Sequence, residues 1–77
     1  MIQPVMTLDT YGLLCPVPIM KTAASIKEIA VGEVLEVLAD APQILEDLPA
    51  WCAGHGHILY DTVEENEEFR LYVRRVK

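Results

Sequence analysis

The stretch Glu-Val-Leu-Glu-Val-Leu-Ala, residues 33–39, is the clearest strand in the first half of the chain. Successive side chains of a strand point to opposite faces, so Leu35, Val37 and Ala39 would share one face. This pattern predicts a strand with one apolar side. The segments before and after it determine how that side is covered.

The segment before this strand predicts a shorter strand and then a helix. Residues 7–11 are rich in β-branched and aromatic side chains, and Gly12 ends the strand that they predict. Pro16 and Pro18 mark where the helix begins, because proline is tolerated in a first helical turn. Apolar residues then recur at three- and four-residue steps, which indicates one buried helix face, at positions 19, 23, 26 and 30.

The segment after this strand predicts a second helix. Asp40 is the expected N-cap. Pro49 lies inside the apolar pattern, so the helix either kinks there or begins near Asp47, and the sequence leaves both alternatives open. Glycines within residues 54–57 end the helix. The apolar residues at helical spacing are Ile44, Leu45, Leu48, Trp51 and Cys52.

The last part of the chain predicts a β-hairpin. Residues 58–63 form one strand, residues 64–67 a turn, and residues 69–74 a strand whose apolar side chains alternate with polar ones. The resulting order, β-α-β-α-β-β, predicts an α/β fold: a two-layer α/β sandwich with a mixed four-stranded sheet. Right-handed crossovers place both helices on one face of that sheet. The other face should be polar or covered by a partner, and the strand order stays open.

Length and charge limit the classes of function. The 77 residues form one domain, residues 1–77. Twelve acidic and six basic residues give a net charge of -6, which disfavours general nucleic-acid binding. Four of the six cations lie within residues 70–77, so a local basic patch stays open. No apolar stretch suits a membrane span or a secretory signal, and we expect a cytoplasmic protein.

Two cysteines, Cys15 and Cys52, are the candidate reactive groups, and in a reducing cytosol we expect both to be thiols. Cys15 lies where the first strand meets the first helix, directly before Pro16. A helix N-terminus favours a thiolate, and the prolines hold the backbone while removing two amide donors. The alternative is that Cys15 is a buried core cysteine without a chemical role, and the residues alone leave both interpretations open.

The pattern Leu8-Asp9-x-x-Gly12-Leu13-x-Cys15-Pro16-x-Pro18 resembles the signature of the TusA/SirA-like sulfur-carrier family. Further matches are Gly32-Glu33, Asp40-x-Pro42, residues 47–52 and Gly56-His57, so the likeness covers nearly the whole chain. The resemblance implies a small two-layer α/β sandwich in which Cys15 accepts sulfane sulfur as a persulfide. Neither a metal nor an organic cofactor is implied.

The resemblance also implies partners. A sulfur-donor protein, either a cysteine desulfurase or a rhodanese, would load Cys15, and a downstream acceptor would take the sulfur, in tRNA thiolation or another sulfur-trafficking pathway. Val17 is apolar where several family members carry an acidic or polar residue, and the first helix has few cations. The specific donor, acceptor and pathway therefore stay open, as does the oligomeric state.

Other residues have a supporting or an alternative role. Asp9 would orient the approach to Cys15 or hydrogen-bond at the strand edge, and Gly12 belongs to the motif. Lys21 would steer an anionic substrate or is simply solvated. Cys52 is a core residue or a resolving thiol. His55 and His57 form a His-x-His pair without an acidic ligand nearby, so no metal site is predicted.

Three functions fit the chain. The first is a sulfurtransferase-type relay through Cys15, and whether such a carrier is an enzyme in its own right stays open. The second is a non-catalytic regulatory or protein-binding module of the same fold. The third is a thiol redox protein, which would form a Cys15–Cys52 disulfide under mild oxidation.

Overall fold

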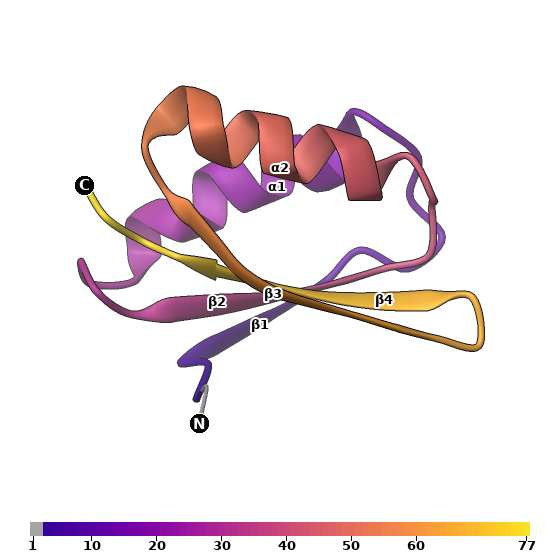
Figure 1. Ribbon diagram of the computed structural model, residues 1–77, viewed down its shortest axis with the longest axis horizontal. Helices are drawn as coiled ribbons and strands as arrows, with labels where there is room; N and C mark the ends of the chain where they lie inside the picture. Colours follow the sequence, from indigo (N-terminus) through magenta and orange to yellow (C-terminus); the bar gives the residue numbers. More distant parts are fainter. Residues whose placement is uncertain (1–2) are drawn as a thin grey trace.

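The computed structural model describes residues 3–77. The expected domain, residues 1–77, includes residues 1 and 2, which lie outside the described part. Four strands and two helices follow the predicted order, with a short 3-10 turn, Ile26–Glu28, after the first helix (Figure 1). They are β1 (Met6–Asp9), α1 (Val17–Ser25), β2 (Val34–Ala39), α2 (Ile44–His55), β3 (Ile58–Glu65) and β4 (Glu68–Arg74).

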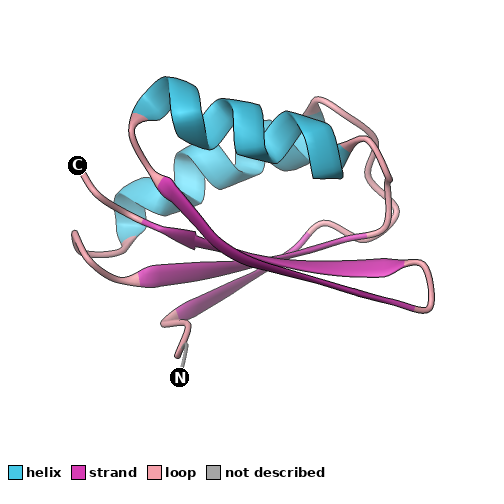
Figure 2. Cartoon of the chain, viewed as in Figure 1, coloured by secondary structure: helices cyan, strands magenta, loops and turns pink. Residues whose placement is uncertain are grey.

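The sheet is mixed and has the strand order β1-β2-β4-β3. β1 pairs parallel with β2, whereas β4 pairs antiparallel with both β2 and β3. Both helices cover the same face, which gives the predicted two-layer α/β sandwich (Figure 2). Within residues 3–77, no helix is both long and apolar enough to cross a membrane.

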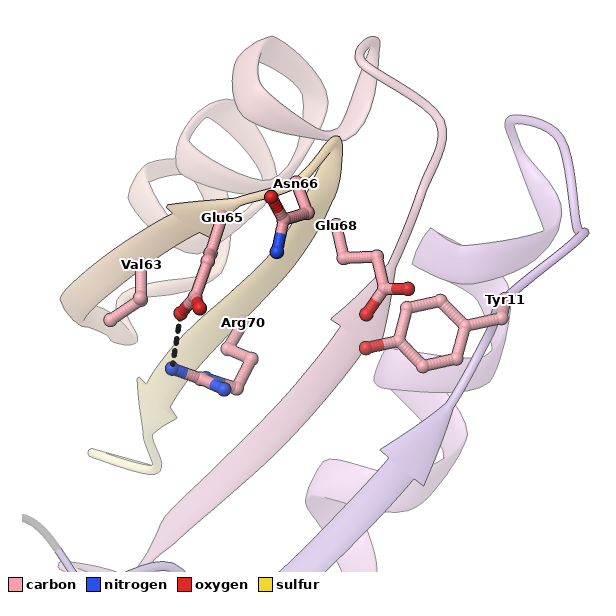
Figure 3. Close-up of a pocket in the computed structure, with 6 residues that line it drawn as sticks. All are labelled: Tyr11, Val63, Glu65, Asn66, Glu68 and Arg70. Atoms are coloured by element: carbon pink, nitrogen blue, oxygen red, sulfur yellow. Dashed lines mark ion pairs between the residues drawn. The ribbon is translucent and has the colours of Figure 1, made fainter.

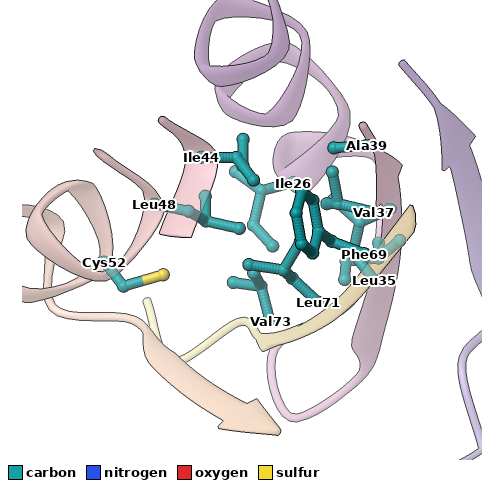
Figure 4. Close-up of a cluster of buried hydrophobic side chains, with 11 residues drawn as sticks. Ile26, Leu35, Val37, Ala39, Ile44, Leu48, Cys52, Phe69, Leu71 and Val73 are labelled. Carbon is teal, nitrogen blue, oxygen red and sulfur yellow. The ribbon is translucent and has the colours of Figure 1, made fainter. Parts of the chain in front are cut away.

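The core lies between the sheet and the helices, and the strand alternation accounts for it. Leu35, Val37 and Ala39 of β2 are fully buried on the helix-facing side, as their spacing predicts. Alternate residues of β4 join them, and α2 closes the cluster (Figure 4). The residues from β4 and α2 are Phe69, Leu71, Val73, Ile44, Leu48 and Cys52.

The first helix differs from its predicted pattern. α1 begins at Val17, between the two prolines that mark its predicted start, but it ends at Ser25 and a 3-10 turn follows it. Thr22 is fully buried, and its hydroxyl donates a hydrogen bond to the carbonyl of Pro18 (2.8 Å). Burial of this polar side chain is tolerated because the hydroxyl has a hydrogen-bond partner. The tighter turn then changes the helical phase, so Ile29 is buried and Ala30 is exposed.

The predicted role of Asp40 is wrong. α2 begins at Ile44, its N-cap position is Gln43, and no side chain caps it. The Asp40 carboxylate instead accepts a hydrogen bond from the backbone N–H of Gly12, at 3.0 and 3.1 Å from its two oxygens. α2 also excludes a start near Asp47, because the helix begins at Ile44 and continues through Pro49.

The hairpin turn is tighter than predicted. β3 extends to Glu65 and β4 begins at Glu68, so only Asn66 and Glu67 form the turn. Both have positive φ angles, 52° and 63°. Positive φ at both central positions matches the right-handed twist of the strands that such two-residue turns connect.

The face of the sheet opposite the helices is largely polar, in line with one of the two predicted alternatives. The Glu36 carboxylate accepts hydrogen bonds from the Thr7 hydroxyl (2.8 Å) and the Tyr72 hydroxyl (2.7 Å), which links β1, β2 and β4. Near the hairpin turn, Figure 3 shows a shallow pocket between Tyr11 and strands β3 and β4. Arg70 and Glu65 form an ion pair there, at 3.9 Å.

Candidate functional site

The loop between β1 and α1 carries Cys15, and hydrogen bonds to β2 hold it in place. The backbone N–H of Thr10 (2.8 Å) and its hydroxyl (2.6 Å) both donate to the carbonyl of Leu38, and Thr10 is fully buried. Asp40, directly after β2, binds the N–H of Gly12. The end of β2 therefore positions the loop from two points.

Gly12 is required in this loop for its backbone conformation. Its φ is +78°, a region that residues with a Cβ rarely adopt. No atom lies within 4 Å of the place where a Cβ would stand, so space does not exclude a larger residue. Next to it, Asp9 accepts a hydrogen bond from the N–H of Tyr11 (2.9 Å), which is the strand-edge role left open for it.

The prolines shape the turn that follows Cys15. The Cys15–Pro16 peptide bond is cis, and Pro16 stands at the N-cap position of α1. The N–H of Val17 donates to the carbonyl of Leu14 (3.0 Å), so it is not available to a sulfur atom. Pro18 is buried and has no N–H. The first turn of α1 therefore offers fewer amide donors to Cys15 than an ordinary helix N-terminus.

Cys15 is a half-buried free thiol. Its neighbour in the first turn of α2 is the Asp47 carboxylate. Hydrogen bonding of the thiol toward this carboxylate raises the pKa of Cys15, with smaller contributions from burial and from the negative charge of Asp47. The same contact lowers the pKa of Asp47. The expected preference for a thiolate is thus not met in the unbound chain, because Asp47 stabilises the protonated form.

Asp47 is a site residue that the sequence did not indicate. It lies within the matched segment of residues 47–52, but helical spacing on α2 gives no sign that it faces a loop far away in the chain. Only the parallel arrangement of the two helices, which both begin beside this loop, brings it to Cys15 (Figure 1).

Exposed apolar side chains flank Cys15. Leu14 is 74% exposed, Met20 is 63% exposed and Val17 is 38% exposed. Val17 and Met20 are three residues apart and therefore lie on the same side of α1. Apolar side chains gathered at a surface are typical of a contact with another protein. Lys21 is exposed nearby, and among the described residues it has no hydrogen bond or ion pair.

Cys52 has a different environment. Its side chain is 2% exposed and belongs to the core cluster (Figure 4). Burial raises its pKa to about 11. The structure does not bring it together with Cys15, because its sulfur lies between α2 and the sheet while Cys15 lies on the outer loop.

His55 and His57 lie beside Trp51, with ring centroids 4.9 and 5.4 Å from it. The Nδ1 atom of His55 is 3.0 Å from the carbonyl of Trp51. The Nδ1 atom of His57 accepts a hydrogen bond from the N–H of Val76 (3.2 Å). Across residues 3–77, no three His, Cys, Asp or Glu side chains come together as metal ligands.

Comparison with known proteins identifies the family. The family model described as "Sulfurtransferase TusA" matches residues 6–75. The chain belongs to the TusA family. This match includes the Cys15 loop, both helices and the whole sheet.

Relatives and a solved structure agree with this assignment. Proteins of Halobacterium salinarum and Archaeoglobus fulgidus are 39% and 34% identical over 72 and 70 residues, which cover 92% and 91% of this chain and 89% and 96% of theirs. YrkF of Bacillus subtilis is 39% identical over 75 residues, 97% of this chain, but the match spans 40% of YrkF. All three carry the name "Putative sulfur carrier protein".

A crystal structure supports the fold. A SirA-like protein of Desulfitobacterium hafniense superposes with a TM-score of 0.83 at 23% identity, covering 95% of this chain and all of that one. The four-stranded mixed sheet with two helices on one face is therefore also the fold of this experimentally solved protein.

Proposed function

We propose that this TusA-family chain carries sulfur as a persulfide on Cys15 and relays it from a donor protein to an acceptor. The observation that supports this most directly is the contrast between its two thiols. Cys15 lies on a fixed outer loop among exposed apolar side chains, whereas Cys52 is buried in the core.

The proposed chemistry is two successive thiol exchanges. Cys15 loses its proton, and its thiolate attacks the outer sulfur of a donor persulfide. A bond forms between Cys15 Sγ and that sulfur while the donor's S–S bond breaks, and the donor leaves as a thiolate that takes up a proton. An acceptor thiolate then attacks the outer sulfur on Cys15. The sulfane sulfur keeps its oxidation state throughout, so no external oxidant or reductant is needed.

Asp47 has a role in the first step. In the resting chain its carboxylate lies beside the Cys15 thiol and favours the protonated form of that thiol. The raised pKa of Cys15 keeps the unloaded carrier protonated and slow to react with stray electrophiles. A bound donor that shields or displaces Asp47 would remove this restraint.

The partners and setting follow from the family and the chemistry. A cysteine desulfurase or a rhodanese is the proposed donor, and tRNA thiolation or another sulfur-trafficking pathway is the proposed destination. The chain acts in the cytoplasm as one domain, residues 1–77, and this exchange chemistry uses no metal or organic cofactor.

Intact mass spectrometry tests the proposal. The chain is incubated with a cysteine desulfurase and cysteine, and separately with a rhodanese and thiosulfate, and peptide mapping locates the added sulfur. We expect the mass of one sulfur atom on Cys15, no loading of a Cys15→Ser variant and full loading of a Cys52→Ser variant. Loading that survives the loss of Cys15 would overturn the proposal.

The alternative, a binding module without sulfur chemistry, makes the opposite prediction about Cys15. The exposed apolar side chains beside it suit protein binding whether or not sulfur is transferred. A Cys15→Ala variant that keeps full partner binding and full function in cells would favour this alternative.

A further inference from the structure

A second pocket lies at the end of the helix layer opposite the Cys15 loop. α1 and α2 both begin beside that loop and run in the same direction, so their C-terminal ends come together near the end of the chain (Figure 1). The pocket between them measures about 270 Å³. Its lining residues are Ala23, Ile26, Lys27, Trp51, His55, His57, Arg75 and Lys77.

All ionisable side chains that line this pocket are basic. They comprise three of the six Lys and Arg residues of the chain and both of its histidines, whereas no Asp or Glu lines the pocket. The chain as a whole carries a net charge of -6. The positive charge is therefore concentrated here against the overall balance of the molecule.

Arg75 forms a fixed wall of this pocket. Its guanidinium donates to the carbonyl of Ile29 (2.5 Å) and to the main-chain oxygen of Lys77 (2.7 Å). Its backbone pairs with Gly32 and Glu33, at 2.7 and 2.9 Å. These bonds hold the C-terminal segment against the end of the 3-10 turn, so the pocket is built from ordered backbone.

The two lysines of the pocket are not used in this way. Among the described residues, neither the Lys27 nor the Lys77 ammonium has a hydrogen bond or an ion pair. The stem of Lys77 lies over Gly56, where an added Cβ would stand 2.8 Å from its Cε atom. At the end of the 3-10 turn, Arg75 already compensates the backbone carbonyls, because its guanidinium donates to those of Lys27 (3.4 Å) and Ile29.

The lowered pKa of His57 agrees with uncompensated positive charge in the pocket. Burial lowers the pKa of His57 first, and the charges of His55, Arg75 and Lys77 lower it further. These groups repel one another, and an anion among them would relieve that repulsion. A water molecule takes about 30 Å³ of liquid volume, so the pocket has room for several waters or for one small oxyanion.

We propose that this basic pocket, defined by Lys27, Trp51, His57, Arg75 and Lys77, binds a tetrahedral oxyanion of the sulfate or phosphate class. The ligand is either a free inorganic anion or the phosphate group of a small molecule. Lys27 and Lys77 supply the unpaired charges, and Arg75 and His57 supply the fixed wall. The site is separate from Cys15 and does not depend on the proposed sulfur relay.

Trp51 makes the proposal directly testable, because it is the only tryptophan of the chain and lines the pocket. Its fluorescence is followed while sodium sulfate, sodium phosphate or adenosine monophosphate is added at constant ionic strength, with sodium chloride as the reference. We expect saturable quenching or enhancement by sulfate and phosphate. Saturation by adenosine monophosphate alone would assign the phosphate group to a larger ligand.

Variants separate this site from a general salt effect. Lys27→Gln and Lys77→Gln should each weaken binding by about three- to fivefold, the range expected for an exposed ion pair. Arg74→Gln is the matched control, because it removes the same charge from the polar face of the sheet and should leave the affinity unchanged. Cys15→Ser should also bind normally.

Two outcomes would overturn the proposal. One is a linear, non-saturating response to all three anions equal to that of chloride. The other is equal weakening by Arg74→Gln and Lys27→Gln, which would show a general charge effect. Neither outcome would affect the proposed sulfur loading of Cys15.

Discussion

At the residue scale, the proposed sulfur relay depends on the pair of Cys15 and Asp47. A thiol that donates to a carboxylate is stabilised as a thiol, and its pKa is raised for that reason. The carboxylate beside Cys15 thus sets the resting state of the carrier, and the N-terminus of α1 does not. Substitution of Asp47 should therefore make the Cys15 thiolate easier to form.

In an Asp47→Asn variant we expect the pKa of Cys15 to fall, because the largest cause of its increase is removed. The rate of iodoacetamide alkylation, measured against pH, should then rise at a lower pH than in the parent chain. Glu46→Gln is the control, since Glu46 lies in the same turn and contacts Gln43, not Cys15. An unchanged profile in Asp47→Asn would contradict this assignment.

Cys52 provides the second prediction at this scale. Its pKa of about 11 keeps it a thiol at pH 8, so alkylation of the folded chain should modify Cys15 alone and reach Cys52 only in urea. Cys52→Ser places a hydroxyl in the apolar core, and we expect it to lower the free energy of unfolding by about 1–3 kcal/mol. Equal alkylation of both cysteines in the folded chain would count against a buried Cys52.

At the scale of elements, the strands could be predicted from sequence and the loop contacts could not. Alternation along β2 and β4 reports directly which side chains are buried, because a strand has a period of two. Asp40 had the right residue type for a cap, yet its carboxylate binds Gly12 on another loop. Contacts between loops distant in the chain leave no periodic signal, which is also why no pattern predicts the contact between Asp47 and Cys15.

The glycines of the loop and of α2 test how the Cys15 loop is held. Gly12→Ala puts a Cβ on a residue with φ of +78°, and we expect a loss of about 1–2 kcal/mol in stability. Gly54→Ala is the matched change, because Gly54 is helical and has open space around it, and it should stabilise by up to about 1 kcal/mol. Urea unfolding compares the two. Equal effects would contradict a conformational requirement at Gly12.

At the scale of the whole molecule, the two proposed sites lie at opposite ends of the helix layer. Both helices begin at the Cys15 loop, beside exposed apolar side chains, and end at the basic pocket. The same parallel arrangement that brings Asp47 to Cys15 gathers the cations far from it. A partner that takes or delivers sulfur would therefore meet an apolar surface, and the basic pocket would stay open to solvent while it did so.

This division predicts how surface changes affect transfer. Leu14→Ser and Met20→Ser should each slow sulfur transfer from a protein donor by about tenfold, because each removes apolar area that the donor would bury. Stability should change by less than about 0.5 kcal/mol, since both side chains are exposed.

Val31→Ser is the control, because Val31 is 61% exposed but follows the 3-10 turn, at the other end of α1 from Cys15. Alkylation of Cys15 by a small molecule should be equal in all three variants, since it involves no docking. If Val31→Ser slowed transfer as much as Leu14→Ser, the donor would bind elsewhere, and the apolar side chains around Cys15 would not be its docking surface.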